Sequence, residues 1–394
     1  MNADAALTRL AALHAQPPCS RVRLGFPTCA PDTSVPEGRA IAEFTCRAPG
    51  VDGVVLHVPA FFDERHPLAG LMHRDEHDPA LWRLHLSVAD DWAAAYTFVP
   101  FIGRTPAWAG LENRYEMVHA LEHEAVIDCT SPYRVIGSDG CPRSVRLMPR
   151  APRLSQCLLQ RQPAPATRTP VASLLVGARR ERADLYVLRA GGAAPAPLRL
   201  LTLFDGPTWG RGHLLEVLAA LVEHGRLADT AVLLVDSGSS DKRWRDLSPT
   251  GRAVTAAVDD SLLAEVDRAL ADHDEQLSPA ARDHIVAGVS LGGLAALLVA
   301  GAAPQRFARA IALSPSVWRY DLVGLLADAL HTSDELRIAV SAGHDEPEML
   351  ACARDLVEAL RRRTAGDRLS LSAVSGGHDW AWWQTQLVTE LLTM

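Results

Sequence analysis

A serine stands among glycines at Gly288-Val289-Ser290-Leu291-Gly292-Gly293, after the apolar run HIVAG and before the small-residue run LAALLVAGA. A strand, a sharp turn and a helix in this order are the context that the G-x-S-x-G nucleophile elbow requires. The turn is strained, so Gly288 and Gly292 must be small enough for the strand and the helix to approach closely. The spacing therefore predicts that Ser290 is a nucleophile whose hydroxyl projects from the end of a sheet.

A histidine near the C-terminus is placed to activate that hydroxyl, because serine is a weak nucleophile until a base removes its proton. His378 follows the strand-like run LSLSAV in the loop Gly376-Gly377-His378-Asp379. Chains with this elbow carry their partners in the order serine, acid, histidine. The run RIAVSAGHDEPEM offers two adjacent carboxylates, Asp345 and Glu346, after the preceding strand. Either can orient His378 and stabilise its imidazolium.

An ester carbonyl under attack by serine also needs two backbone N–H groups directed at its developing negative charge. Leu291, directly after the serine, is expected to supply one of them. The other is expected from the loop after an early strand, LTLFDGPTWGRG, where Gly206 is the candidate and Pro207 has no N–H to donate. The mechanism that these residues predict is acyl transfer through a serine ester, with no metal or other cofactor.

The elements that must position these residues form an alternating pattern in the second half of the chain. The runs LRLLTLF, DTAVLLVDS, HIVAGVS, ARAIALSPS, LRIAVSAG and LSLSAV predict buried strands, and LLVGARRERADLYVLRA before them predicts a hairpin. Helical patterns separate the strands, among them one helix over TAAVDDSLLAEVDRALADH. Strands that alternate with helices predict a mostly parallel sheet with helices on both faces, here an α/β-hydrolase domain.

The first half of the chain has a different pattern of secondary-structure signals. Short strand-like runs, AIAEFTC, GVVLHV, WRLHLSV and AAYTFV, are separated by turn signals. They predict a smaller β-sandwich-like domain, and the proline-containing stretch 154–170 predicts the boundary between two domains, 1–160 and 161–394.

Composition narrows the function further. The chain has 394 residues, and a net charge of −8 argues against a nucleic-acid-binding protein, which needs a basic face. No apolar run reaches the roughly 18 residues of a membrane span. The N-terminal run MNADAALTRLAALHAQPP predicts a short amphipathic helix rather than a secretory signal, and seven scattered cysteines indicate reduced thiols. These features predict a cytoplasmic protein without a membrane partner.

Four segments together resemble the ferric enterobactin (enterochelin) esterases: LFDGPTW, the elbow GVSLGGLAAL, the A-G-x-x-E-P run from Ala342 to Pro347, and SGGHD with the later Trp383. Those cytoplasmic hydrolases open catecholate siderophore tri-esters so that iron is released. The resemblance implies that a ferric siderophore ester is the substrate and that iron arrives only as part of it. It also favours Glu346 over Asp345 as the acid.

The resemblance adds candidate substrate-binding residues. Arg243 and Asp246, in DKRWRDL, stand in the place of the family's R-x-x-E-L segment, which implies that Arg243 holds catecholate oxygens. Asp246 replaces a glutamate of the family pattern there, and SPTGRAV after it lacks the asparagine expected from that pattern. The small domain is expected to wall the active-site cleft, and the tryptophans expected to give it aromatic surface are Trp209, Trp380 and Trp383, with Trp382 beside them.

Other functions are open at this point. A carboxylesterase or acyltransferase of the esterase D type, acting on a different ester, has the same motifs. The runs 73–77 and 119–123 both match H-x-x-E-H, which on a helix places two histidines on one face and predicts a zinc hydrolase. A carbohydrate-binding module would use exposed tryptophans, for which Trp82, Trp92 and Trp108 are the candidates.

Overall fold

The computed structural model describes residues 3–13, 36–59, 61–62, 66, 68–160, 168–176, 181–191, 196–238, 240–364 and 366–394. The strands are β1 (Arg39–Arg47), β2 (Gly53–His57), β3 (His73–Arg74), β4 (Leu81–Ala89), β5 (Ala93–Phe101), β6 (Arg134–Ile136), β7 (Pro142–Leu147), β8 (Ala172–Val176), β9 (Glu181–Leu188), β10 (Arg199–Phe204), β11 (Thr230–Val235), β12 (His284–Val289), β13 (Arg309–Leu313), β14 (Arg337–Gly343) and β15 (Leu369–Val374). The α-helices are α1 (Ala3–Ala11), α2 (Arg114–Glu124), α3 (Arg153–Leu158), α4 (Gly206–Trp209), α5 (Leu214–Glu223), α6 (Ser240–Asp246), α7 (Arg252–Val258), α8 (Ser261–Ala271), α9 (Leu291–Ala302), α10 (Val323–Thr332), α11 (Pro347–Arg361) and α12 (Trp380–Thr393). Short 3₁₀ helices are η1 (Ala107–Gly110), η2 (Ala281–Asp283), η3 (Val317–Arg319) and η4 (Gly366–Arg368).

The second half of the chain forms a sheet of eight strands in the order β15-β14-β13-β12-β10-β11-β9-β8. The strands from β10 to β15 pair in parallel, whereas β9 runs antiparallel to β11 and closes the β8–β9 hairpin at the edge. Separate clusters of buried side chains lie on its two faces, one beneath α9 and its neighbours and the other beneath α5 and α12. The predicted α/β-hydrolase fold is confirmed.

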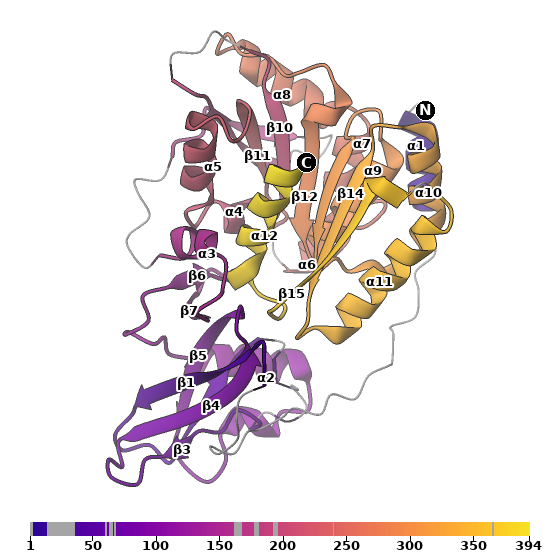
Figure 1. The fold of residues 1–394 in the computed structure, drawn as a ribbon. Helices are drawn as coiled ribbons and strands as arrows, with labels where there is room; N and C mark the ends of the chain where they lie inside the picture. The colour runs from indigo at the N-terminus through magenta and orange to yellow at the C-terminus, as the bar shows by residue number, and fades with distance from the viewer. Residues whose placement is uncertain are drawn as a thin grey trace.

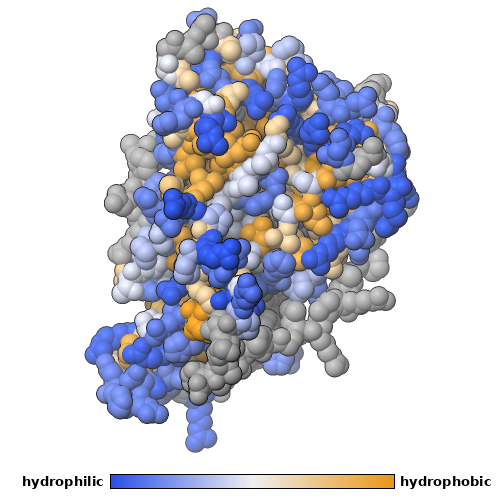
Figure 2. All heavy atoms as spheres, viewed as in Figure 1, coloured by the Kyte–Doolittle hydropathy of each residue, from blue (hydrophilic) through white to orange (hydrophobic). Residues whose placement is uncertain are grey.

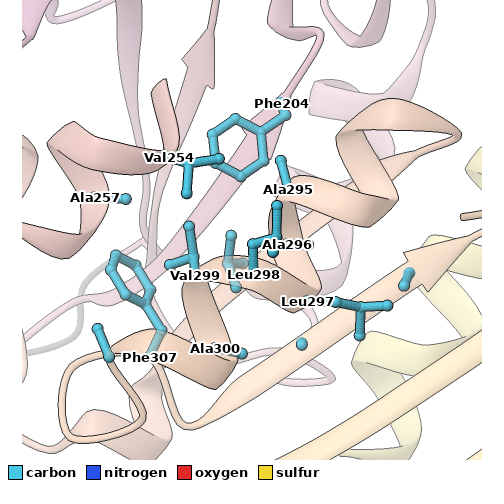
Figure 3. Close-up of a cluster of buried hydrophobic side chains, with 14 of the residues drawn as sticks. Phe204, Val254, Ala257, Ala295, Ala296, Leu297, Leu298, Val299, Ala300 and Phe307 are labelled. Carbon is cyan, nitrogen blue, oxygen red and sulfur yellow. The ribbon is translucent and has the colours of Figure 1, made fainter. Parts of the chain in front are cut away.

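Helix α9, which follows the elbow, is buried along its whole length. Its small and aliphatic side chains pack against Phe204 of β10, Val254 of α7 and Phe307 (Figure 3). A helix that is apolar on every side is stable only in an interior position. The nucleophile turn is therefore anchored at both ends, in the central strand β12 and in this buried helix.

The small domain consists of two antiparallel sheets, β1-β4-β3 and β2-β5-β7-β6. Alternating side chains of both sheets meet in one apolar cluster that includes Phe44, Leu56, Leu86 and Phe98. Figure 1 shows this domain, in indigo and purple, beneath the end of the large sheet from which the loops after β14 and β15 emerge. The predicted sandwich-like domain is confirmed.

The first helix departs from the predicted division at residue 160. Helix α1 packs against α7 and α9 of the large domain, far from the small sheets that follow it in the chain (Figure 1). Ala6 and Leu10, one turn apart on its apolar face, are both 0% exposed and belong to the core of the large domain. The predicted amphipathic helix is thus present but lies on the other domain, and the boundary after 160 borders residues 161–167, which lie outside the described residues.

One predicted helix is two. The run from 255 to 273 divides into the end of α7 and α8, because Asp260 adopts φ 71°. The carboxylate of Asp259 accepts hydrogen bonds from the backbone N–H and the hydroxyl of Ser261, which offers the chain an alternative to continued helix. The pair Asp259-Asp260 is therefore a turn between helices.

The surface in Figure 2 is mostly hydrophilic, with hydrophobic atoms in narrow strips between polar side chains on the face shown. Within the described part of the chain, no helix combines the length and the apolar character that crossing a membrane requires.

Candidate active site

Ser290 occupies the sharp turn between β12 and α9, with φ 54° and ψ −116°. Such a conformation is costly for a residue with a side chain and persists only where the surroundings enforce it. A Cβ on Gly288 would lie 2.4 Å from the backbone carbon of Gly292, so the strand and the helix touch at the two flanking glycines. The Ser290 hydroxyl lines a cavity of about 200 Å³ and lies 3.4 Å from the Ser316 hydroxyl.

His378 lines this cavity, and the carboxylate of Glu346 lies directly behind it. Nδ1 of His378 is 2.7 Å from Oε2 of Glu346, whose side chain is only 3% exposed. The other carboxylate oxygen accepts hydrogen bonds from the backbone N–H of Gly343 at 2.6 Å and from the Ser314 hydroxyl. Because these donors hold the carboxylate in place, it orients the imidazole so that Nε2 is directed away from Glu346.

The adjacent carboxylate, Asp345, takes a different partner. Its Oδ2 accepts a hydrogen bond of 2.7 Å from the indole N–H of Trp92, in the small domain. Burial raises the pKa of Asp345. The two candidate acids therefore separate in space, and only Glu346 contacts His378.

The two candidate oxyanion donors are each the first residue of a helix, Leu291 of α9 and Gly206 of α4. A first helical N–H has no acceptor within its own helix and remains available to a ligand. Gly206 is packed so closely that an added Cβ would lie 2.4 Å from the carbonyl carbon of Leu234. Its position depends on Asp205 before it, which adopts φ 64°.

Arg243 lines the cavity, but most of its guanidinium is already engaged. Nε and Nη2 each lie 2.7 Å from one oxygen of Asp205, and Nη2 also donates to the carbonyl of Val289. Nη1 takes no part in these hydrogen bonds, and binding of catecholate oxygens by Arg243 stays a prediction. Asp246, at the end of α6, is 3% exposed and lies 3.7 Å from Nε of Arg252.

Replacing Arg243 by leucine is expected to lower the free energy of unfolding by about 3 kcal/mol, because it leaves the buried Asp205 carboxylate without its partner. Lysine keeps the charge but loses the paired geometry and is expected to cost about 1 kcal/mol. Urea unfolding of the three proteins measures both differences. A leucine variant as stable as the wild type would show that the pair does not hold the loop before Gly206.

Aromatic side chains line one wall of the cavity. Trp380 and Trp383, at the start of α12, both line it, and the rings of Trp383 and His378 form a T-shaped pair with centroids 4.9 Å apart. The indole N–H of Trp383 donates to the Ser314 hydroxyl at 2.9 Å, so this residue also supports the hydrogen bonds of Glu346.

Trp209 does not line the cavity, contrary to the sequence prediction. It is 0% exposed, donates its indole N–H to the carbonyl of Phe204 at 2.9 Å and meets Trp380 edge to face. Trp382 is likewise buried and donates to the carbonyl of Gly377 at 2.6 Å. Both side chains pack the interior beneath the site.

The small domain supplies the opposite wall, as expected from the sequence. Pro59, Val135 and Ser138 line the cavity together with Arg143. Arg143 pairs with Glu122 at 2.7 Å and with Asp139 at 2.9 Å, so this wall carries a compensated positive charge.

The remaining sequence motifs have structural explanations. The carbohydrate-stacking candidates Trp82, Trp92 and Trp108 are 4%, 1% and 1% exposed, so they are core residues. His73 lies in strand β3, so the run 73–77 does not place two histidines on one helix face. The run 119–123 is on α2, but no group of three His, Cys, Asp or Glu side chains suited to a metal occurs among the described residues.

Two polar residues of the site have no predicted role. Ser314 follows β13, next to the nucleophile strand, and a polar residue at the carboxyl end of a buried parallel strand is a usable signal. Asp379 directly follows His378, is 4% exposed and accepts hydrogen bonds from the backbone N–H groups of Ala95 at 3.2 Å and Ala381 at 2.5 Å. Burial raises the pKa of Asp379 to about 7.

This raised pKa predicts a pH-dependent loss of stability. Between about pH 4 and 7 the folded protein retains the Asp379 proton, whereas the unfolded chain has released it, so the free energy of unfolding falls as pH rises through this range. An Asp379→Asn variant is expected to fall less steeply. Urea unfolding at intervals from pH 4.5 to 7.5 compares the two slopes, and equal slopes would contradict the prediction.

Comparisons with known proteins agree with this geometry. The model of a family described as putative esterase matches residues 193–394, and that of the enterochelin esterase N-terminal domain matches residues 42–157. The iron(III) enterobactin esterase of Escherichia coli O6:H1 is 26% identical over 333 residues, which are 80% of this chain and 79% of that protein. The iron(III) salmochelin esterase of the same organism is 31% identical over 212 residues, 49% of each chain.

Solved structures share the two-domain fold. The ferric enterobactin esterase of Salmonella typhimurium has a TM-score of 0.71 at 22% identity and covers 90% of this chain and 93% of its own. The enterobactin esterase of Shigella flexneri, solved in the presence of enterobactin, has a TM-score of 0.70 at 22% identity and covers 92% of this chain and 94% of its own. The chain therefore belongs to the putative esterase family, and in it the esterase domain follows a domain that matches the enterochelin esterase N-terminal model.

Proposed function

We propose that this protein is a serine esterase that hydrolyses the ester bonds of a ferric catecholate siderophore, such as an enterobactin-type trilactone. The observation that carries the reaction is the strained Ser290 in the same cavity as His378, whose Nδ1 lies 2.7 Å from the buried Glu346. The substrate class is supported by the relatives named for enterobactin and salmochelin.

The proposed chemistry proceeds in two acyl transfers. Ser290 attacks an ester carbonyl while Nε2 of His378 takes its proton, and Glu346 stabilises the imidazolium that forms. The backbone N–H groups of Leu291 and Gly206 donate hydrogen bonds to the carbonyl oxygen and stabilise the negative charge that develops on it. The C–O bond of the substrate ester then breaks, the alcohol leaves with the proton from His378, and the acyl group stays on Ser290 as an ester. Water activated by the same imidazole hydrolyses that ester and releases the acid.

In this proposal the substrate binds without a resident cofactor, and the cavity offers it arginine and tryptophan side chains. Two arginines, Arg143 and Arg243, line it from opposite domains, each paired with carboxylates. A substrate with phenolate oxygens would meet Nη1 of Arg243, with Trp380 and Trp383 as apolar surface for its rings. Iron in this scheme is cargo that the substrate chelates.

Product analysis tests the substrate. The protein is incubated with ferric and iron-free enterobactin-type trilactone and, separately, with p-nitrophenyl acetate, and the products are identified by liquid chromatography and mass spectrometry. Linear dihydroxybenzoyl-serine fragments formed from the trilactone support the proposal. Cleavage of the acetate ester alone would retain the esterase and reject the siderophore in favour of an esterase D-like activity.

A further inference from the structure

We infer that the small domain positions the catalytic acid and base, through hydrogen bonds from strand β5 and the residue before it to the loops that carry Glu346 and His378. This inference rests on the proposed esterase mechanism and adds a function for the small domain beyond lining the cavity. Trp92, Asp345 and Asp379 are the positioning residues.

The first contact acts on the acid. Trp92 lies directly before β5, is 1% exposed and has its ring in the apolar cluster of the small domain. Its indole N–H donates to Asp345 at 2.7 Å, and Asp345 is the residue before Glu346. A rigid indole buried in one domain thus holds the backbone that carries the acid of the other.

The second and third contacts act on the base. The backbone N–H of Ala95 in β5 donates to Asp379, the residue after His378. The N–H of Ala93 in the same strand donates to the carbonyl of Ser375 at 3.1 Å, at the other end of the histidine loop. Strand β5 therefore holds the loop 375–379 on both sides of His378.

The two held loops also contact each other. The backbone N–H of Asp345 donates to the carbonyl of Gly376 at 3.0 Å, and a Cβ on Gly343 would lie 2.2 Å from that same oxygen. Such close contact means that a shift of either loop changes the separation of Glu346 and His378. Since displacement of a catalytic group by about 1 Å can cost 10²-fold in rate, the interdomain contacts matter for turnover.

The test uses Trp92→Phe, which removes the N–H but retains an aromatic ring, with Trp108→Phe as its matched control. Trp108 is also 1% exposed in the small domain, and its indole nitrogen has no hydrogen-bond partner, so its replacement perturbs packing but breaks no interdomain bond. Turnover of p-nitrophenyl acetate is measured in the full-length proteins. We expect Trp92→Phe to lower kcat about 10- to 100-fold with KM unchanged, and Trp108→Phe to lower it less than threefold.

A double-mutant cycle identifies the link. Asp345→Leu is expected to lose as much kcat as Trp92→Phe, and the double variant is expected to lose no more than either, because both changes break the same bond. Asp345→Asn keeps an oxygen that accepts from the indole, and its kcat is expected to stay within threefold of wild type. Losses that multiply in the double variant would overturn the inference.

Two further outcomes would also contradict the positioning role of the small domain. Equal kcat values for Trp92→Phe and Trp108→Phe, or a change confined to KM, would mean that the small domain only lines the cavity. Failure of the proposed function has a different signature, which is esterase activity that survives the loss of Ser290. A protein that needs Ser290 and tolerates Trp92→Phe would refute the positioning role alone.

Discussion

Replacement of Ser290 by alanine is expected to lower kcat for ester hydrolysis by about 10⁴- to 10⁶-fold, the range in which loss of a serine nucleophile falls. The reason is that the attacking oxygen is removed, while the oxyanion donors and the cavity remain. The free energy of unfolding should change little, because alanine retains the Cβ of Ser290 and lacks only the hydroxyl group. Initial rates with p-nitrophenyl acetate and urea unfolding measure the two effects.

Ser316→Ala is the matched control for this variant. Its hydroxyl lies 3.4 Å from that of Ser290 and is buried in the same site, but it is not on the strained turn. We expect its kcat to stay within tenfold of wild type, and a fluorophosphonate to label the Ser316→Ala protein but not the Ser290→Ala protein. Full activity of a folded Ser290→Ala protein would reject the serine mechanism.

Glu346→Gln is expected to lower kcat by about 10³- to 10⁴-fold. One side of the glutamine amide must accept from Gly343, as the carboxylate does, which leaves its NH₂ group facing Nδ1 of His378. A donor at that position favours the tautomer with the proton on Nε2, and this tautomer cannot take the proton of Ser290. Binding of substrate should be unaffected, so the whole loss is expected in kcat.

The neighbouring carboxylate provides the comparison for this acid. Asp345→Asn has the same change of charge one residue away and still accepts from Trp92, so its loss is expected to be far smaller than that of Glu346→Gln. Steady-state rates of the two variants on the same ester decide the assignment. A larger loss in Asp345→Asn would identify Asp345 as the functional acid and reject Glu346.

The nucleophile and its fold were accessible from the sequence because local constraints are strong there. A G-x-S-x-G turn between an apolar strand and a small-residue helix has few alternative structures, and the predicted strands from 198 to 374 all lie in the large sheet. The sequence motifs did not by themselves distinguish Asp345 from Glu346 as the acid. Adjacent residues in a loop point in different directions, and only their partners, Trp92 and His378, distinguish them.

The tryptophans show why the residues that line the cavity could not be identified from the sequence alone. Trp209 and Trp380 are both largely apolar side chains near catalytic loops, yet one is fully buried and the other lines the cavity. Burial of an aromatic residue depends on what packs over it from distant parts of the chain, and no sequence period reports that. The same holds for α1, whose partners in α7 and α9 lie more than 240 residues further along.

Helix α1 changes how the two domains are related in the chain. Because residues 3–11 complete the core of the large domain, the small domain is an insertion, which the polypeptide enters and leaves between α1 and β8. A truncated protein that begins at residue 161 would therefore lack Ala6 and Leu10, and the apolar surface beside α9 that they cover would be exposed to water. During synthesis, α1 is made long before the helices α7 and α9 against which it packs. The core of the large domain can therefore be completed only after α9 has been synthesised.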